Sequence, residues 1–123
     1  MTGPERAHVA PTAADATADA LVALVEELTD AIAELDLVRE RARAVLHRRA
    51  AGTGYADIVG SKERPFIAEM LTATMTGLGE AGGRYRRAQV RALRAEGCTV
   101  PEIARLFGVT RQRVSALLDD GTR

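Results

Sequence analysis

A long amphipathic helix constrains the fold of this chain more than any other feature. Between Asp19 and Ala51, apolar residues recur at intervals of three and four, which is the spacing of one face of an α-helix. The stripe comprises Leu21, Leu24, Val25, Leu28, Ile32, Leu35, Val38, Ala42, Val45 and Leu46. A helix of about 30 residues is about 45 Å long at 1.5 Å per residue. The stripe is wider than the seam of a strict coiled coil.

This stripe needs an apolar surface to cover it, and two arrangements supply one. We find no other segment long enough to cover the whole helix, so we interpret the stripe as a homodimer interface. The expected contact residues are Leu21, Leu24, Val25, Leu28, Ile32, Leu35 and Val38. The alternative is that the helix folds back on its own domain.

Charge is distributed unevenly although the formal net charge is zero. Residues 1–40 contain nine acidic and two basic residues, a net charge of −7. Residues 84–118 contain eight arginines and two acidic residues, a net charge of +6. A basic C-terminal half indicates a polyanionic partner such as DNA.

The rest of the chain divides into three parts. Residues 1–17 show no periodicity and are expected to be disordered. Residues 18–80 form a helical module for oligomerisation or interaction, with a short apolar piece after Gly54 and a further helix from about Lys62 to Thr76. Four glycines within residues 77–83 predict a loop or hinge. Residues 84–123 form a separate module, and the fold class is all-α.

Three helices are predicted in the last forty residues, and their ends have clear local signals. The first runs from about Arg84 to Glu96 and ends at Gly97. Thr99 and Glu102 form a capping box for a helix over 100–107, which Gly108 ends. Thr110 caps the third helix, over 111–118. Ile103, Ala104, Phe107, Val109, Val114, Leu117 and Leu118 are the expected core positions.

The stretch from Glu102 to Ser115, EIARLFGVTRQRVS, resembles the helix-turn-helix of region 4 in the primary sigma factors. It is also similar to the DNA-binding ends of resolvases and to many small bacterial regulators. The resemblance covers residues 84–118. It implies that Arg111, Gln112, Ser115 and Ala116 read bases. Gln112 stands where the sigma pattern usually has an acid, and Ser115 where it usually has an arginine.

Side-chain chemistry suggests a role for each of these residues. Arg111 can bind guanine O6 and N7, and Gln112 can bind adenine N6 and N7 in the major groove. The expected contacts to the DNA backbone are Thr110, Arg113, Arg84, Arg86, Arg87 and Thr99. A homodimer would place two such helices about 34 Å apart on a two-fold DNA site.

These observations favour a sequence-specific transcriptional regulator of double-stranded DNA. One cysteine and two distant histidines exclude a metal site of usual spacing, and we expect no cofactor. We find no catalytic arrangement and expect no enzyme. A single cysteine and the absence of a signal or membrane segment favour the cytoplasm. Two alternatives remain: an adaptor that binds the transcription machinery through its acidic helix, and a nonspecific nucleoid-type DNA binder.

Overall fold

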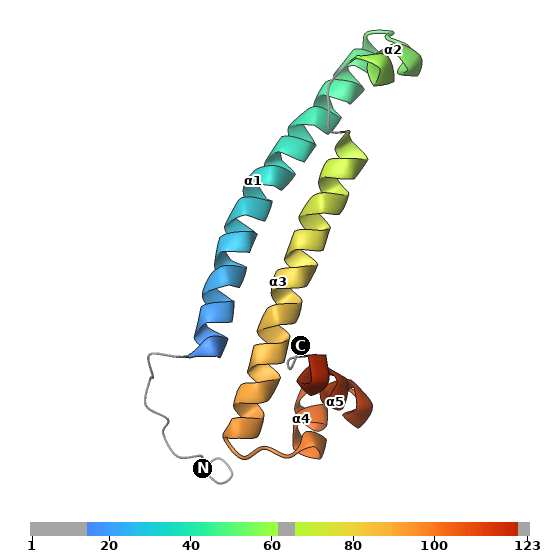
Figure 1. The fold of residues 1–123 in the computed structure, drawn as a ribbon. Coiled ribbons are helices and arrows are strands. Elements are labelled where there is room, and N and C mark those ends of the chain that lie inside the picture. The colour runs from blue at the N-terminus through green and yellow to red at the C-terminus, as the bar shows by residue number, and fades with distance from the viewer. Residues whose placement is uncertain (1–14, 62–65, 121–123) are drawn as a thin grey trace, which may run out of the picture. The chain divides into compact units, whose positions relative to one another are not determined.

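The computed structural model describes residues 15–61 and 66–120, and every regular element in them is helical. The elements are α1 (Ala16–Ala50), α2 (Tyr55–Gly60), α3 (Ile67–Ala95), α4 (Val100–Phe107) and α5 (Arg111–Asp120) (Figure 1). The prediction of an all-α fold is confirmed. The predicted disordered segment lies outside the described residues except for its last three positions, of which two are helical. The start predicted for the helix after residue 61 also lies outside them.

The chain divides into two compact units. One consists of residues 25–80, and the other combines the chain up to Leu24 with residues 81–123. Helices α1 and α3 each contribute to both units, because the division falls within each of them.

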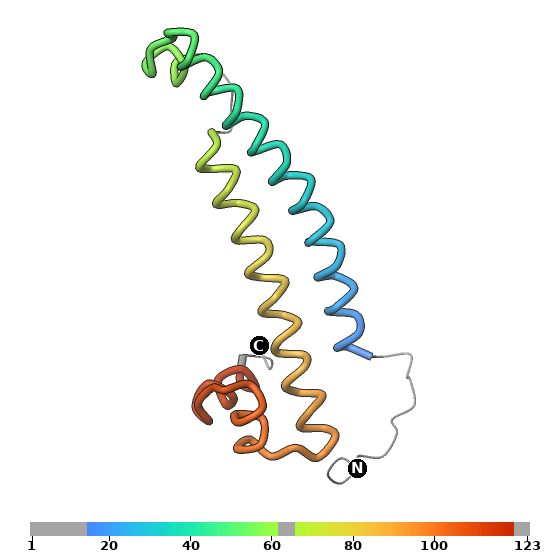
Figure 2. The backbone as a smooth tube through the Cα atoms, turned by 180° about the vertical axis from the view of Figure 1, so that it is seen from behind, coloured from blue at the N-terminus to red at the C-terminus, as the bar shows by residue number. Residues whose placement is uncertain are grey.

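Residues 25–80 form a helical hairpin. In this unit α1 and α3 lie side by side and run in opposite directions, with α2 in the connection between them (Figures 1 and 2). The Thr74 hydroxyl donates to Glu34 Oε2 at 2.8 Å, and Arg41 Nη1 lies 3.3 Å from Met70 Sδ. The buried residues are Ala31, Val38, Ile58, Met70 and Thr74. Helix α1 therefore packs against α3 of its own chain, which is the alternative to a homodimer interface given above.

The predicted loop over residues 77–83 is wrong, because α3 continues through all four glycines. None of these glycines has a positive φ angle. Glycine costs a helix about 1 kcal/mol relative to alanine, so packing outweighs local preference here. At Gly77, a Cβ would lie 2.5 Å from Oε1 of Glu27, so the flexible side chain of Glu27 on α1 lies against α3 at this glycine. Because α3 is unbroken, a second segment is long enough to lie along α1.

The other unit contains a small core where the C-terminal part of α3 meets α4 and α5. Val90, Ile103 and Val114 are fully buried, and Cys98, Ala104 and Leu117 complete the buried cluster. Leu93, Val100, Phe107 and Leu118 pack against it. The start of α1 belongs to the same unit, where the Thr17 hydroxyl donates to the carbonyl of Ala88 at 3.1 Å.

The C-terminal ends of α1, α3 and α4 follow one pattern. Gly52, Gly97 and Gly108 all have φ between 66° and 99°. Each is followed by an amide that donates back to the carbonyl five residues earlier, as in Cys98 N to Leu93 O at 3.0 Å. This is the Schellman motif, which needs the left-handed conformation that glycine adopts without a Cβ clash.

Candidate nucleic-acid interface

Local hydrogen bonds determine both ends of α4, as predicted. The Thr99 hydroxyl accepts from the amide of Glu102 at 3.2 Å, and the Glu102 carboxylate accepts from the amide of Thr99 at 2.9 Å. This is the expected capping box, and Pro101 lies in the first turn, where no intrahelical amide is required. Gly108 ends the helix with φ 66° and ψ 35°. An eight-residue helix thus has both ends satisfied by its own sequence.

A short turn connects α4 to α5 and orients the second helix. The Thr110 hydroxyl accepts from the amide of Arg113 at 3.0 Å, so Thr110 caps α5 as predicted. Val114 and Leu117 hold α5 against the core, with 0% and 4% of their surface exposed. Val109, which we expected to plug the turn, is instead 40% exposed. A side chain that is 40% exposed contributes little to a core, so packing of the turn does not depend on Val109.

The four predicted base-reading residues lie together on the exposed side of α5. Arg111, Gln112, Ser115 and Ala116 are all exposed. Their spacing of one, three and one residues places them on one face of a helix. The buried residues Val114 and Leu117 lie on the opposite face. Core packing therefore leaves one face of the first two turns of α5 exposed to solvent, and Arg111 and Gln112 are the first residues on that face.

The residues predicted to contact the DNA backbone differ in their exposure and in the contacts they make within the protein. Thr110, Arg113 and Arg84 are exposed, and Arg87 is half-buried. The guanidinium of Arg86 lies 4.1 Å from the ring centroid of Phe107, a cation–π contact that joins α3 to the end of α4. The Thr99 hydroxyl already accepts the capping hydrogen bond. Thr99 thus has a clear structural role, whereas Arg84 and Arg113 project freely from the surface.

Two residues of this buried cluster were missed from the sequence. Val90 is fully buried on α3 and Cys98 is 2% exposed between α3 and α4. Val90 is flanked by Gln89 and Arg91, so the local sequence did not predict that it would be buried. Val90 lies two residues after buried Ala88 and so faces a different side of α3, and its burial depends on the segments that pack against that side.

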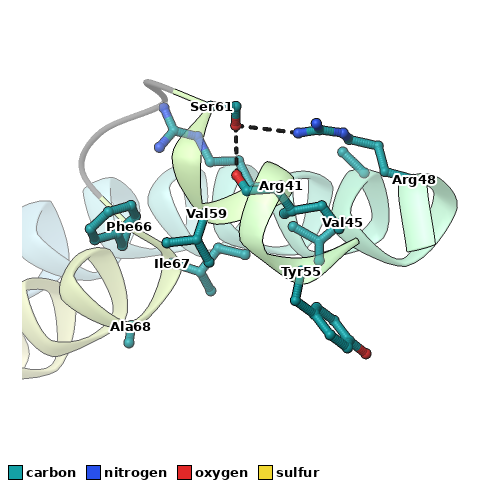
Figure 3. A pocket seen from close by; sticks show the side chains of 11 residues that line it. Arg41, Val45, Arg48, Tyr55, Val59, Ser61, Phe66, Ile67 and Ala68 are labelled. Atoms are coloured by element: carbon teal, nitrogen blue, oxygen red, sulfur yellow. Dashed lines mark hydrogen bonds between the residues drawn. The ribbon is translucent and has the colours of Figure 1, made fainter. Parts of the chain in front are cut away.

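The hairpin unit contains a hollow of about 430 Å³ beside α2 (Figure 3). Its lining is mostly apolar, with Val45, Ile58 and Phe66 among the residues, and it includes Arg41 and Arg48. The Ser61 hydroxyl accepts from Arg48 Nη1 at 3.2 Å and donates to the carbonyl of Ile58 at 2.7 Å. These hydrogen bonds hold the C-terminal end of α2 beside α1.

Within residues 15–61 and 66–120, no helix is both long and apolar enough to cross a membrane. The same residues contain no group of three or more histidine, cysteine or acidic side chains arranged to hold a metal ion.

Comparisons of the chain with protein-family models, with curated protein sequences and with solved structures find no match.

Proposed function

We propose that this protein binds double-stranded DNA and acts as a sequence-specific transcriptional regulator, with α4 and α5 as a helix-turn-helix. The observation that carries the proposal is that α5 has one buried apolar side and one exposed polar side. One side is anchored by Val114 and Leu117, and the other exposes Arg111 and Gln112 at the N-terminal end. Helix-turn-helix proteins contact bases with the N-terminal residues of the second helix.

The side chains at the start of α5 suit the major groove. Arginine can bind both acceptors of guanine, and glutamine can bind the acceptor and donor of adenine. In the proposed complex, Arg111 and Gln112 make these contacts. Ser115 lies one turn further along, and Ala116 can contact a thymine methyl group. Each good bidentate contact discriminates against a wrong base by about 1–3 kcal/mol.

Phosphate contacts would set the position of α5 in the groove. The N-terminus of a helix favours anions because its first amides point outward. Thr110 and Arg113 lie at this end of α5 and are both exposed. Arg84, Arg86 and Arg87 supply further positive charge from α3, and the stacking of Arg86 on Phe107 keeps one of them beside α4. These contacts would contribute affinity without sequence preference.

A binding and selection experiment tests the proposal. The wild-type protein and the double variant Arg111→Ala, Gln112→Ala are titrated with a random-sequence duplex pool at two salt concentrations, and the bound DNA is sequenced. Arg43→Ala serves as the control, because Arg43 is an exposed arginine of the hairpin that pairs with Glu40. We expect the wild type and the control to enrich one motif, and the double variant to lose it while retaining weak binding.

Each contrary outcome identifies a different function. Steep salt dependence with no enriched motif in any protein would indicate a nonspecific nucleoid-type binder. No DNA binding by the wild type would reject the proposal in favour of an adaptor that acts through its acidic helix. Equal losses in the control and the double variant would show that general charge, and not α5, binds the DNA.

A further inference from the structure

Among the described residues, none covers one apolar side of α1 in the hairpin unit. Val25, Leu28, Ile32 and Leu35 recur at intervals of three and four, and between 38% and 64% of their surface is exposed. Leu46, which is 70% exposed, lies on the same side near the end of the helix, with Arg39 and the half-buried Ala42 at the two positions between. Scattered exposed apolar residues are ordinary, but a regular stripe of large ones marks an interaction surface.

A second stripe on α1 is the one that α3 covers. Ala31 and Val38 are buried, and Leu24, Arg41 and Val45 are half-buried. Leu24, Ala31 and Val45 each precede an exposed apolar residue by one position, as Ala31 precedes Ile32. Successive residues of an α-helix are rotated by about 100°. Helix α1 thus carries two neighbouring stripes, and α3 is wide enough to cover only one.

Helix α3 repeats the arrangement. Met70 and Thr74 are buried against α1, whereas Leu71 and Met75, each one residue further on, are 42% and 59% exposed. Of the residues predicted to form a dimer interface, Val38 lies in the hairpin's own interior, and Leu21, Val25, Leu28, Ile32 and Leu35 stay exposed. The covered and uncovered stripes of both helices therefore keep the same one-residue offset.

The two uncovered stripes lie on the same side of the hairpin. On each helix the uncovered stripe is rotated by about 100° from the covered one, in the right-handed sense along the chain. The helices run in opposite directions and face each other, so these equal rotations point to the same side. Val25, Leu28, Ile32, Leu35, Leu71 and Met75 thus form one surface, which we call the apolar face.

We propose that a second copy of this chain covers the apolar face, with the two α1 helices antiparallel, to form a four-helix bundle. A two-fold dimer uses the same patch on both subunits, so a single stripe of regular spacing can pair with itself. Four-helix bundles are built from such stripes on neighbouring helices.

Charge along α1 favours a second copy in the antiparallel orientation. Residues 25–36 contain five acidic side chains and no basic one, whereas residues 39–49 contain five arginines and one glutamate. Antiparallel pairing brings the acidic half of one helix level with the basic half of the other, and Asp36, Arg39 and Arg43 are the charged residues of these halves that adjoin the apolar stripe. Parallel pairing of the two helices would place like charges together, which is destabilising. The two-fold axis then falls near Leu35, at the middle of the stripe.

The oligomeric state of matched variants tests which face is covered. Ile32→Glu places a charge on the apolar face at a residue that is 64% exposed in the single chain. Leu37→Glu is the control, since Leu37 is 49% exposed on the other side of the same helix. By light scattering and sedimentation without DNA, we expect wild type and Leu37→Glu at twice 13.1 kDa and Ile32→Glu at 13.1 kDa. Circular dichroism should show equal helicity in all three.

Several outcomes would overturn this proposal. A wild type that stays at 13.1 kDa at high concentration would reject a second copy as the occupant of the apolar face. Dissociation by both variants, or by neither, would place the interface elsewhere. None of these outcomes depends on DNA binding, so they are distinguishable from a failure of the proposed function.

Spin-label distances test the antiparallel orientation. Cysteines replace Glu26 or Ala33 in a Cys98→Ala background. These exposed positions are seven residues apart and occupy the same side of α1. With a two-fold axis near Leu35, the axial separation between copies should be about 20 Å greater at position 26 than at position 33. Equal distances at the two positions would reject the antiparallel arrangement.

Discussion

The unit that contains α4 and α5 closes its own core, whereas the hairpin does not. Val90, Ile103 and Val114 are completely buried where three helix segments meet. In the hairpin, buried residues include small ones such as Ala31 and Thr74, and large ones such as Ile32 and Met75 remain exposed. Both units have apolar residues at helical spacing. The difference is that three crossing helices enclose a volume, whereas two helices side by side cover only one stripe each.

This contrast separates two uses of apolar sequence. Side chains of the closed core stabilise the unit within one chain, so their contribution should be independent of protein concentration. Side chains of the apolar face stabilise the hairpin only when a partner covers them. Association stabilises the folded state by mass action, so that contribution should increase with concentration.

The largest change in the free energy of unfolding is expected when an isoleucine is truncated in the closed core, compared with one on the apolar face. Ile103→Ala should lower the free energy of unfolding by about 2–5 kcal/mol, because it leaves a cavity in a closed core. Ile32→Ala should change it by less than about 0.5 kcal/mol in dilute solution, where the side chain is solvated. Urea unfolding at several protein concentrations measures both. A large effect of Ile32→Ala at the lowest concentration would contradict the distinction between the units.

Alanine at two glycines should act in opposite directions. Gly108 has φ 66°, and a residue with a Cβ is less stable in this conformation by roughly 1–2 kcal/mol. Gly79 is helical and exposed, and a Cβ there would meet no atom within 4 Å. Gly79→Ala should therefore stabilise the protein by roughly 0.5–1 kcal/mol. Thermal unfolding of both variants tests the signs, and destabilisation by Gly79→Ala would show that the helix needs flexibility there.

The smallest effect is expected when a threonine that caps a helix is replaced, compared with a threonine inside a helix. Thr99→Ala removes the cap of α4 and should cost about 1 kcal/mol. Thr72→Ala is the control, because its hydroxyl donates to the carbonyl of Ala68 within α3, at 2.9 Å. This second change should be neutral or slightly stabilising, since alanine favours helix more than threonine does. Equal losses in urea unfolding would mean that the capping box contributes nothing specific.

Much of the candidate site could be predicted from the sequence. The capping box at Thr99, the stop at Gly108 and the cap at Thr110 each depend on residues within one helical turn, and all three were predicted correctly. The exposed residues Arg111 and Gln112 followed from the position of the apolar residues on the same short helix. Burial of Val90 and Cys98 could not be predicted in this way, because it depends on which segment packs over them.

The sequence by itself determined the helical class, the ends of the short helices and the apolar spacing of α1. Each of these properties arises from interactions between residues at most five apart along the chain. Only the tertiary structure decided that α3 continues through Gly77, Gly79, Gly82 and Gly83, and which stripe of α1 it covers. Glycine weakens a helix by an amount that long-range packing can exceed. Two adjacent stripes of similar hydrophobicity compete for one neighbouring helix, and only their fit against that helix distinguishes them.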